Sequence, residues 1–178
     1  MLNDPASASK FMSLVLRHRP DTIGIELDAE GWVAVAELVE KSGGKLTDGL
    51  VRQIVRDNEK QRFALSEDGL GIRANQGHSV VVDLGLSAIK PPERLFHGTA
   101  TRFIASIMDQ GLKPGMRQFV HLSPDQETAI KVGQRHGKPV VLNVDAGALH
   151  SDGGSFYVSH NGVWLIGSVP ARYLSVAD

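Results

Sequence analysis

The sequence predicts an α+β protein built from two small lobes. The first half reads as two helices with a short turn and then a hairpin, whereas the second half mixes short strands with two helices. These strands are too closely spaced for a regular series of strand–helix–strand units. Pro91 and Pro92 cannot extend a helix or sit in a central strand, so they predict a stiff linker. We therefore assign one lobe to residues 1–90 and the other to residues 93–178.

The first lobe is expected to open with a helix that Ser7 or Ser9 caps and Pro20 stops. Alternating and amphipathic patterns between turn residues predict its other elements: a strand at 23–27, helices at 34–41 and after the capping residue Thr47, and strands at 63–65 and 71–74. This order of helix, turn, helix and hairpin resembles a winged helix.

The second lobe is richer in strand signals. Short apolar runs bounded by Gly, Pro, Ser or Asp predict strands at 95–97, 119–122, 140–144 and 162–165. Helices are expected from Thr101 to Gln110 and from Pro124 to His136, with Ser123 capping the second and Thr99 able to cap the first.

Composition excludes several classes of protein. The chain has 19 Lys and Arg against 20 Asp and Glu, a net charge of −1, which excludes binding of nucleic acid by bulk charge but leaves room for a local basic pocket. The absence of cysteine rules out disulfides and thiolate ligands. No apolar run approaches the roughly 20 residues that span a bilayer, and the N-terminus lacks signal-peptide features. We expect a cytoplasmic protein with no membrane partner.

Four cationic residues lie at the ends of predicted elements, where side chains can converge on a ligand: Arg17, His18, Arg62 and Arg117. Guanidinium groups bind phosphate bidentately, and imidazole adds a titratable donor. For any one arginine taken alone, a solvated surface charge is the better interpretation, and spacing alone does not show that the four converge.

Three polar motifs could serve the same ligand. The cluster Asn75–Ser79 suits hydrogen bonding to phosphate, sugar or base, although an ordinary loop with a turn at Gly77 explains it equally well. His97-Gly98-Thr99 follows a strand, where Gly98 would let a ligand approach the backbone. His121-Leu122-Ser123 repeats the arrangement at the next strand, which makes a shared cleft more plausible.

Other chemistries lack their motifs. No His-Glu-x-x-His pattern or helical ligand pair predicts a metal site, and no G-x-S-x-G context supports a nucleophilic serine. There is no P-loop and no G-x-G-x-x-G motif, so any dinucleotide-binding site must be built from a different motif.

The motifs taken together resemble one family. They are Leu16–Pro20, Lys60–Phe63, Ile72–Ser79, Leu95–Thr99, Met116–Ser123 and Asn161–Leu165, in that order. They are similar to those of the NAD-dependent RNA 2′-phosphotransferases, the tRNA-splicing-associated family called KptA in bacteria. Each motif alone is weak, but the ordered set is specific and covers the chain from about Ser9 to Leu174.

The resemblance implies an N-terminal winged-helix RNA-binding lobe and a C-terminal ADP-ribosyltransferase-like, NAD-binding lobe. It also implies the reaction. An internal RNA 2′-phosphate attacks the anomeric carbon of NAD⁺ and expels nicotinamide, and the ribose 2″-hydroxyl then attacks the phosphate. The products are RNA with a free 2′-hydroxyl and ADP-ribose 1″,2″-cyclic phosphate.

The resemblance further assigns the site residues. The catalytic set is Arg17, His18, Arg62 and Arg117. NAD⁺ is held by His97, Gly98 and Thr99, with His121 and Ser123 lining the cleft, and no metal takes part. The RNA is contacted by Arg73, Gln76, Gly77, His78 and Ser79.

Two positions depart from common patterns. Val163 stands where many ADP-ribosyltransferases carry a catalytic glutamate, which argues against ADP-ribosylation of a hydroxyl or protein nucleophile and is compatible with a phosphate that arrives ionised. Phe119 stands where a histidine is common in the family, so that position cannot be catalytic here.

We expect the protein to be a monomer. Two alternative functions stay open. The first is an ADP-ribosyltransferase that caps 5′-phosphate ends of RNA or DNA and stops after the first step. The second is a winged-helix nucleic-acid-binding module with a degenerate partner lobe, which the complete set of four cationic residues disfavours.

Overall fold

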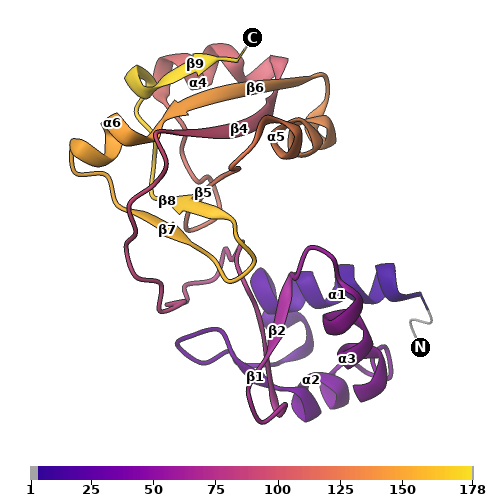
Figure 1. Cartoon of the computed structure of the whole chain (residues 1–178). Helices are drawn as coiled ribbons and strands as arrows, with labels where there is room; N and C mark the ends of the chain where they lie inside the picture. Colours follow the sequence, from indigo (N-terminus) through magenta and orange to yellow (C-terminus); the bar gives the residue numbers. More distant parts are fainter. Residues whose placement is uncertain (1–3, 178) are drawn as a thin grey trace. The chain divides into compact units, whose positions relative to one another are not determined.

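The computed structural model describes residues 4–177. The chain forms two compact units, Met1–Gly85 and Leu86–Asp178, coloured indigo to magenta and magenta to yellow in Figure 1. Each unit combines helices with small antiparallel sheets. The predicted α+β class is therefore confirmed.

The first unit opens with helix α1 (Pro5–Arg17), whose cap differs from the prediction. Asp4 is the capping residue, and its carboxylate accepts hydrogen bonds from the backbone N–H groups of Ala6 and Ser7. Proline suits the position that follows the cap, because no intrahelical partner is needed there for an N–H. The prediction of Ser7 or Ser9 as the cap is wrong because the helix starts earlier.

The strand predicted at 23–27 is also wrong. The 3₁₀ helix η1 (Pro20–Ile23) occupies its start, and Gly24 then turns the chain with a φ of 68°. Thr47 caps helix α3 as predicted, by accepting a hydrogen bond from Leu50 N–H. The remaining elements of this unit are α2 (Val35–Lys41), α3 (Asp48–Asp57), β1 (Val33–Ala34), β2 (Phe63–Leu65) and β3 (Gly71–Ala74), with the three strands in the order β1-β3-β2.

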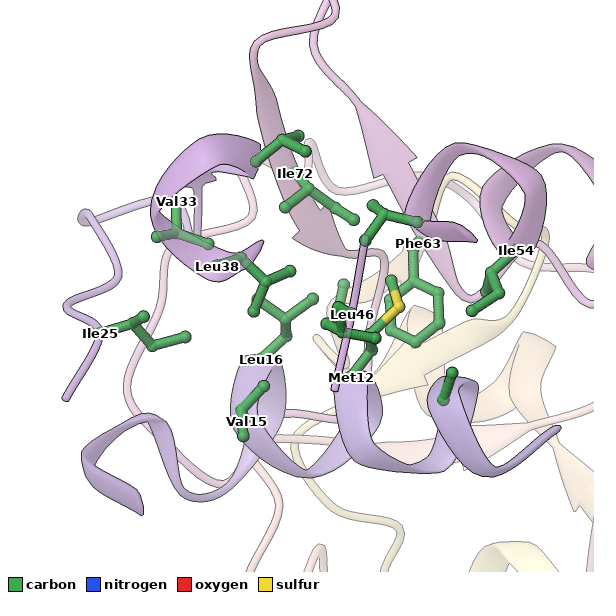
Figure 2. Close-up of a cluster of buried hydrophobic side chains, with 14 residues drawn as sticks. Met12, Val15, Leu16, Ile25, Val33, Leu38, Leu46, Ile54, Phe63 and Ile72 are labelled. Carbon is green, nitrogen blue, oxygen red and sulfur yellow. The ribbon is translucent and has the colours of Figure 1, made fainter. Parts of the chain in front are cut away.

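One face of α1 is buried in the core of the first unit. Figure 2 shows Met12, Val15 and Leu16 of this helix among apolar side chains from the other elements. All three are 0% exposed, so rotating or sliding the helix would expose apolar surface at a cost of roughly 25 cal/mol per Å². This packing fixes the position of the helix end, where Arg17 and His18 lie.

The second unit contains two three-stranded antiparallel sheets, with orders β4-β6-β9 and β5-β8-β7. Phe96 in β4 and Ser123 after β5 exchange backbone hydrogen bonds of 2.9 and 2.7 Å, which join the two sheets. The strands are β4 (Arg94–Ala100), β5 (Val120–Leu122), β6 (Pro139–Asp145), β7 (Phe156–Val158), β8 (Trp164–Ile166) and β9 (Leu174–Val176).

Helices cover these sheets, and two predicted caps are corrected. Asp125 rather than Ser123 caps α5, because its carboxylate accepts the Thr128 N–H. Thr99 lies inside β4 and caps nothing.

Across residues 4–177, no helix has the length and apolar character needed to cross a membrane. The helices are η2 (Thr101–Phe103), α4 (Ile104–Gln110), α5 (Gln126–Gly133), η3 (Gln134–His136), α6 (Ala146–Ser151) and η4 (Ala171–Tyr173).

Helix α5 lies against strand β4 with almost no separation. A Cβ atom added to Gly98 would lie 1.7 Å from the carbonyl oxygen of Ala129, and one added to Gly133 would lie 2.6 Å from the carbonyl oxygen of Thr99. The two glycines therefore allow helix and strand backbones to touch. The close approach at Gly98 that the sequence assigned to a ligand is made by this helix.

Candidate active site

The first cluster of predicted site residues gathers at the end of α1, and we call it the α1 cluster: Arg17, His18, Arg62 and the loop 75–79. The Arg17 Nη2 atom donates a 3.3 Å hydrogen bond to the backbone carbonyl of Arg62, and its guanidinium carbon lies 5.8 Å from the centre of the Phe63 ring. The structure thus brings Arg17 next to the segment that carries Arg62.

His18 follows the last residue of α1 and contacts Ser79. Its Nδ1 atom lies 3.0 Å from the Ser79 hydroxyl oxygen. That hydroxyl is also 3.5 Å from the carbonyl oxygen of Arg17, which can only accept. The geometry favours a hydroxyl that donates to the carbonyl and accepts from Nδ1.

Backbone hydrogen bonds hold the loop 75–79 to both neighbours. Ser79 N–H donates to the Arg17 carbonyl at 2.9 Å, and Asn75 N–H donates to the Arg62 carbonyl at 2.9 Å. The Asn75 side chain donates a further 2.6 Å bond to the Gln61 carbonyl. Asn75, which belongs to the predicted polar cluster but not to the predicted RNA contacts, is thus a positioning residue.

Gly77 takes a conformation that needs glycine. Its φ is +89°, and a Cβ atom there would lie 3.6 Å from Arg17 Nη1. The loop backbone therefore passes directly over the Arg17 side chain. Gln76, the preceding residue, is half-buried.

His78 is buried, which argues against the predicted contact of its side chain with RNA. It is 1% exposed, and neither ring nitrogen has a hydrogen-bond partner. Burial, followed by the charges of Arg17, His18 and Arg73, lowers the pKa of His78 to about 4. A neutral imidazole at this point lets three cationic side chains share a small volume without a fourth charge.

Arg73 is likewise directed into the protein. It is 7% exposed, its guanidinium carbon lies 4.6 Å from the centre of the Trp32 ring, and its Nη1 lies 3.5 Å from the Glu30 carbonyl oxygen. Stacking on an aromatic face is a typical environment for a buried guanidinium. These contacts give Arg73 a structural role, and its contact with RNA stays a prediction.

His18 and Arg62 open onto the same surface hollow. This hollow of about 410 Å³ is lined by their side chains and by residues of α1. Two groups that the sequence placed 44 positions apart therefore face a shared space. A phosphate in this hollow would meet an imidazole and a guanidinium, both of which can donate hydrogen bonds.

The second cluster lies in the other unit, and we call it the β4–β5 cluster: His97, Arg117, His121 and Ser123. His97 Nδ1 lies 3.0 Å from the backbone carbonyl oxygen of His121. Because a carbonyl only accepts, Nδ1 carries the proton, and the neutral ring presents Nε2 as an acceptor. Burial and the charge of His136 lower the pKa of His97, against the raising effect of the carbonyl bond, so the neutral form is favoured.

Arg117 approaches the same cluster from the loop before β5. Its Nη1 atom lies 3.5 Å from His121 Nδ1. Arg117 is exposed, but desolvation by the protein atoms around its guanidinium, and then the nearby charge of Arg135, lower the pKa of Arg117, although a guanidinium stays protonated at neutral pH. Arg135, which the sequence argument missed, thus adds a second guanidinium to the electrostatic environment of this cluster.

The other predicted residues of this unit have mixed surroundings. Ser123 is half-buried and pairs its backbone with Phe96, whereas Gly98 and Thr99 are buried in β4 next to α5. Phe119 packs on Tyr157, with ring centres 5.7 Å apart. Residues 4–177 contain no group of three or more histidine, cysteine or carboxylate side chains placed to hold a metal ion.

Comparisons with known proteins identify close relatives. A family model described as RNA 2'-phosphotransferase, Tpt1 / KptA family, matches residues 3–168. A probable RNA 2'-phosphotransferase from Agrobacterium fabrum is 56% identical over 96% of this chain and 94% of its own length. Proteins of the same name from Acaryochloris marina and Burkholderia lata are 55% and 51% identical, over 94% and 98% of this chain and 94% and 92% of their own lengths.

Proposed function

Because the chain belongs to the RNA 2'-phosphotransferase, Tpt1 / KptA family, we propose that it removes an internal 2′-phosphate from RNA by transferring it to NAD⁺. The observation that carries the proposal is identity of 56% across nearly the whole of both chains. The match spans both clusters, and we propose roles for their side chains below.

In the proposed first step, an oxygen of the RNA 2′-phosphate forms a bond to the anomeric carbon of NAD⁺ while the bond to nicotinamide breaks. The phosphate arrives as a dianion and nicotinamide leaves as a neutral molecule, so neither a strong base nor an acid is required. The absence of a glutamate at Val163 is compatible with this step. The main task of the protein is to hold the two reacting groups in line.

In the proposed second step, the ribose 2″-hydroxyl attacks phosphorus and the RNA 2′-oxygen leaves with a proton. Negative charge grows on the phosphoryl oxygens, and we propose that the guanidinium groups of Arg17 and Arg62 stabilise it. The Nε2 atom of His18, with Nδ1 held by Ser79, is suited to moving the proton between the two hydroxyl groups.

The polar groups of the β4–β5 cluster fit NAD⁺. His97 Nε2 is an acceptor for a ribose hydroxyl, and the cations Arg117 and Arg135 suit a pyrophosphate. His121 and Ser123 lie beside them, and Gly98 and Thr99 support the cluster by packing β4 on α5. We accordingly propose an ADP-ribosyltransferase-like role for the second unit.

We also propose that the first unit is a winged-helix lobe that receives the RNA. Support comes from α2, α3 and the β2–β3 hairpin, in which Phe63 pairs with Ala74 and Leu65 with Ile72. The hairpin leads directly into the loop 75–79, which contacts Arg17 and His18.

The deciding experiment incubates the protein with an RNA that carries one internal 2′-phosphate, with and without NAD⁺. We expect loss of the phosphate and release of one nicotinamide per RNA only when NAD⁺ is present, and no effect of EDTA. Loss of phosphate without NAD⁺ would contradict the proposal. A stable ADP-ribosylated product without cyclic phosphate would instead favour end-capping activity, for which a 5′-phosphorylated RNA is the comparison substrate.

A further inference from the structure

The exposed side of α1 carries a groove, and the proposed reaction uses only the end of it that His18 and Arg62 line. Ala6, Ser9, Lys10, Ser13 and Leu14 line the hollow of about 410 Å³ that ends at His18 and Arg62. Their spacing of three and four residues places them on one stripe of the helix, beside the buried face formed by Met12, Val15 and Leu16. From position 6 to position 18 an α-helix extends about 18 Å.

The charge of this groove suits an anion. Lys10, His18 and Arg62 line it, and among residues 4–177 no acidic side chain does. The carboxylate of the nearby Asp4 is engaged by the N–H groups of Ala6 and Ser7.

A second hollow of about 350 Å³ shares Ala6, Ser9 and Arg62 with the first but also contains Asp57 and Glu59. Lys60 and Arg62 balance these two carboxylates in the second hollow, whereas the charged residues of the first hollow are all basic or imidazole groups, so a polyanion that leaves Arg62 is attracted more by the first.

The side chains of the groove also match the parts of a nucleotide. Ala6, Ser9 and Ser13 are short, so a ligand can approach the helix, and the two serine hydroxyls can donate to phosphate or ribose oxygens. Leu14 is 42% exposed and offers an apolar surface to a base. A base can lie on such an apolar side chain in a single strand, whereas a duplex pairs and stacks its bases internally.

We infer that the α1 groove binds the single-stranded RNA that flanks the 2′-phosphate, with Lys10 on a phosphodiester and Leu14 beneath a base. This inference rests on the proposed function, since it takes the 2′-phosphate to lie at His18 and Arg62. It predicts that affinity for the substrate increases with the length of the strand beyond the reacting nucleotides.

The test compares two substrates that carry the same internal 2′-phosphate, a dinucleotide and a decanucleotide. We expect Lys10→Glu to raise KM for the decanucleotide about fivefold more than it raises KM for the dinucleotide. Leu14→Ala keeps the charge, and we expect it to raise KM for the decanucleotide about twofold more than KM for the dinucleotide. Lys90→Glu is the matched control, because Lys90 is exposed and lies outside the groove. In Lys10→Gln, the dependence of log affinity on log salt should decrease by about 0.7.

Direct binding of an unphosphorylated decanucleotide, followed by fluorescence anisotropy, separates this inference from the proposed function. Weaker binding by Lys10→Glu but not by Lys90→Glu supports the groove even if the wild type removes no 2′-phosphate. Equal effects of the two substitutions would assign the change to bulk charge and overturn the inference. So would equal KM changes for the two substrates, or binding by Lys10→Glu as tight as that of the wild type.

Discussion

The Nδ1 atom of His18 lies 3.0 Å from the hydroxyl oxygen of Ser79, although 61 residues separate them in the chain. The serine backbone is fixed independently, because its N–H donates to the Arg17 carbonyl. The hydroxyl can therefore orient the imidazole without itself depending on the imidazole. This arrangement gives Ser79 a positioning role that is separable from folding.

Ser79→Ala should accordingly slow the reaction by about tenfold, the equivalent of one lost hydrogen bond, while KM for RNA changes little. The pH dependence of kcat should also shift, since the hydroxyl no longer sets the protonated nitrogen of His18. Single-turnover rates across pH measure both effects. Ser151→Ala is the control, because Ser151 is exposed and its hydroxyl donates to the Gly147 carbonyl on α6. An unchanged pH profile in Ser79→Ala would contradict the positioning role.

The buried His78 should make the first unit less stable in acid. Its pKa is about 4 in the folded protein and about 6.5 in the unfolded chain, so between these values the unfolded state binds more protons. The contribution of His78 to the free energy of unfolding is complete above the pKa that the residue has in the unfolded chain. It decreases as the pH falls, by about 2 kcal/mol between about pH 7 and pH 5.

Urea unfolding of the His78→Leu variant tests this expectation. The variant should lose less stability over the same pH range than the protein with His78. A Trp164→Phe background leaves Trp32, in the same unit as His78, as the fluorescent reporter. The same pH dependence in both proteins would assign the acid sensitivity to other groups.

Gly98→Ala should strongly destabilise the second unit. The added Cβ would overlap the Ala129 carbonyl, so α5 must move away from β4, and we expect a loss of about 3 kcal/mol or more. Gly167→Ala is the control, because it is in the same unit, has ordinary φ and has no atom within 4 Å of the added Cβ. Thermal unfolding followed by Trp164 fluorescence compares the two. Similar melting temperatures would show that α5 gives way easily.

Local patterns predicted most elements, and their failures have physical causes. Thr47 and the hairpin about residues 66–69 were predicted correctly because caps and turns are specified by adjacent residues. The strand at 23–27 failed because alternation alone does not reveal the 3₁₀ turn that begins at Pro20. Sequence separation likewise concealed the contacts of Gly98 with α5 and of Asn75 with Gln61, which depend on segments 31 and 14 residues away.

The candidate site could be predicted only in part for the same reason. The sequence shows which cationic residues lie at the ends of predicted elements. No local pattern, however, shows that Arg73 stacks on Trp32 or that His78 is buried. Both belong to the motif Ile72–Ser79, which also contains Ser79. Only the packing of β3 and the loop 75–79 distinguishes a side chain that faces the ligand from one that supports it.

The side chain of Arg62 can be removed without breaking the α1 cluster, because the structural contacts of this residue use its backbone. Its carbonyl accepts hydrogen bonds from Asn75 N–H and Arg17 Nη2, and both can persist in Arg62→Ala. The proposed second step places more charge on the phosphoryl oxygens than the first. Losing one guanidinium should therefore slow the second step more, by roughly a hundredfold.

Arg62→Ala is thus expected to accumulate the ADP-ribosylated RNA 2′-phosphate, seen as a slower band in a single-turnover gel assay. Arg62→Lys should restore little, since an ammonium cannot reproduce the two-pronged contact of a guanidinium with phosphate. Arg56→Ala is the control, because Arg56 is exposed on α3 and pairs with Asp57. If Arg62→Ala loses both steps with no intermediate band, Arg62 serves substrate binding or the first step equally, and the division of labour between the steps is wrong.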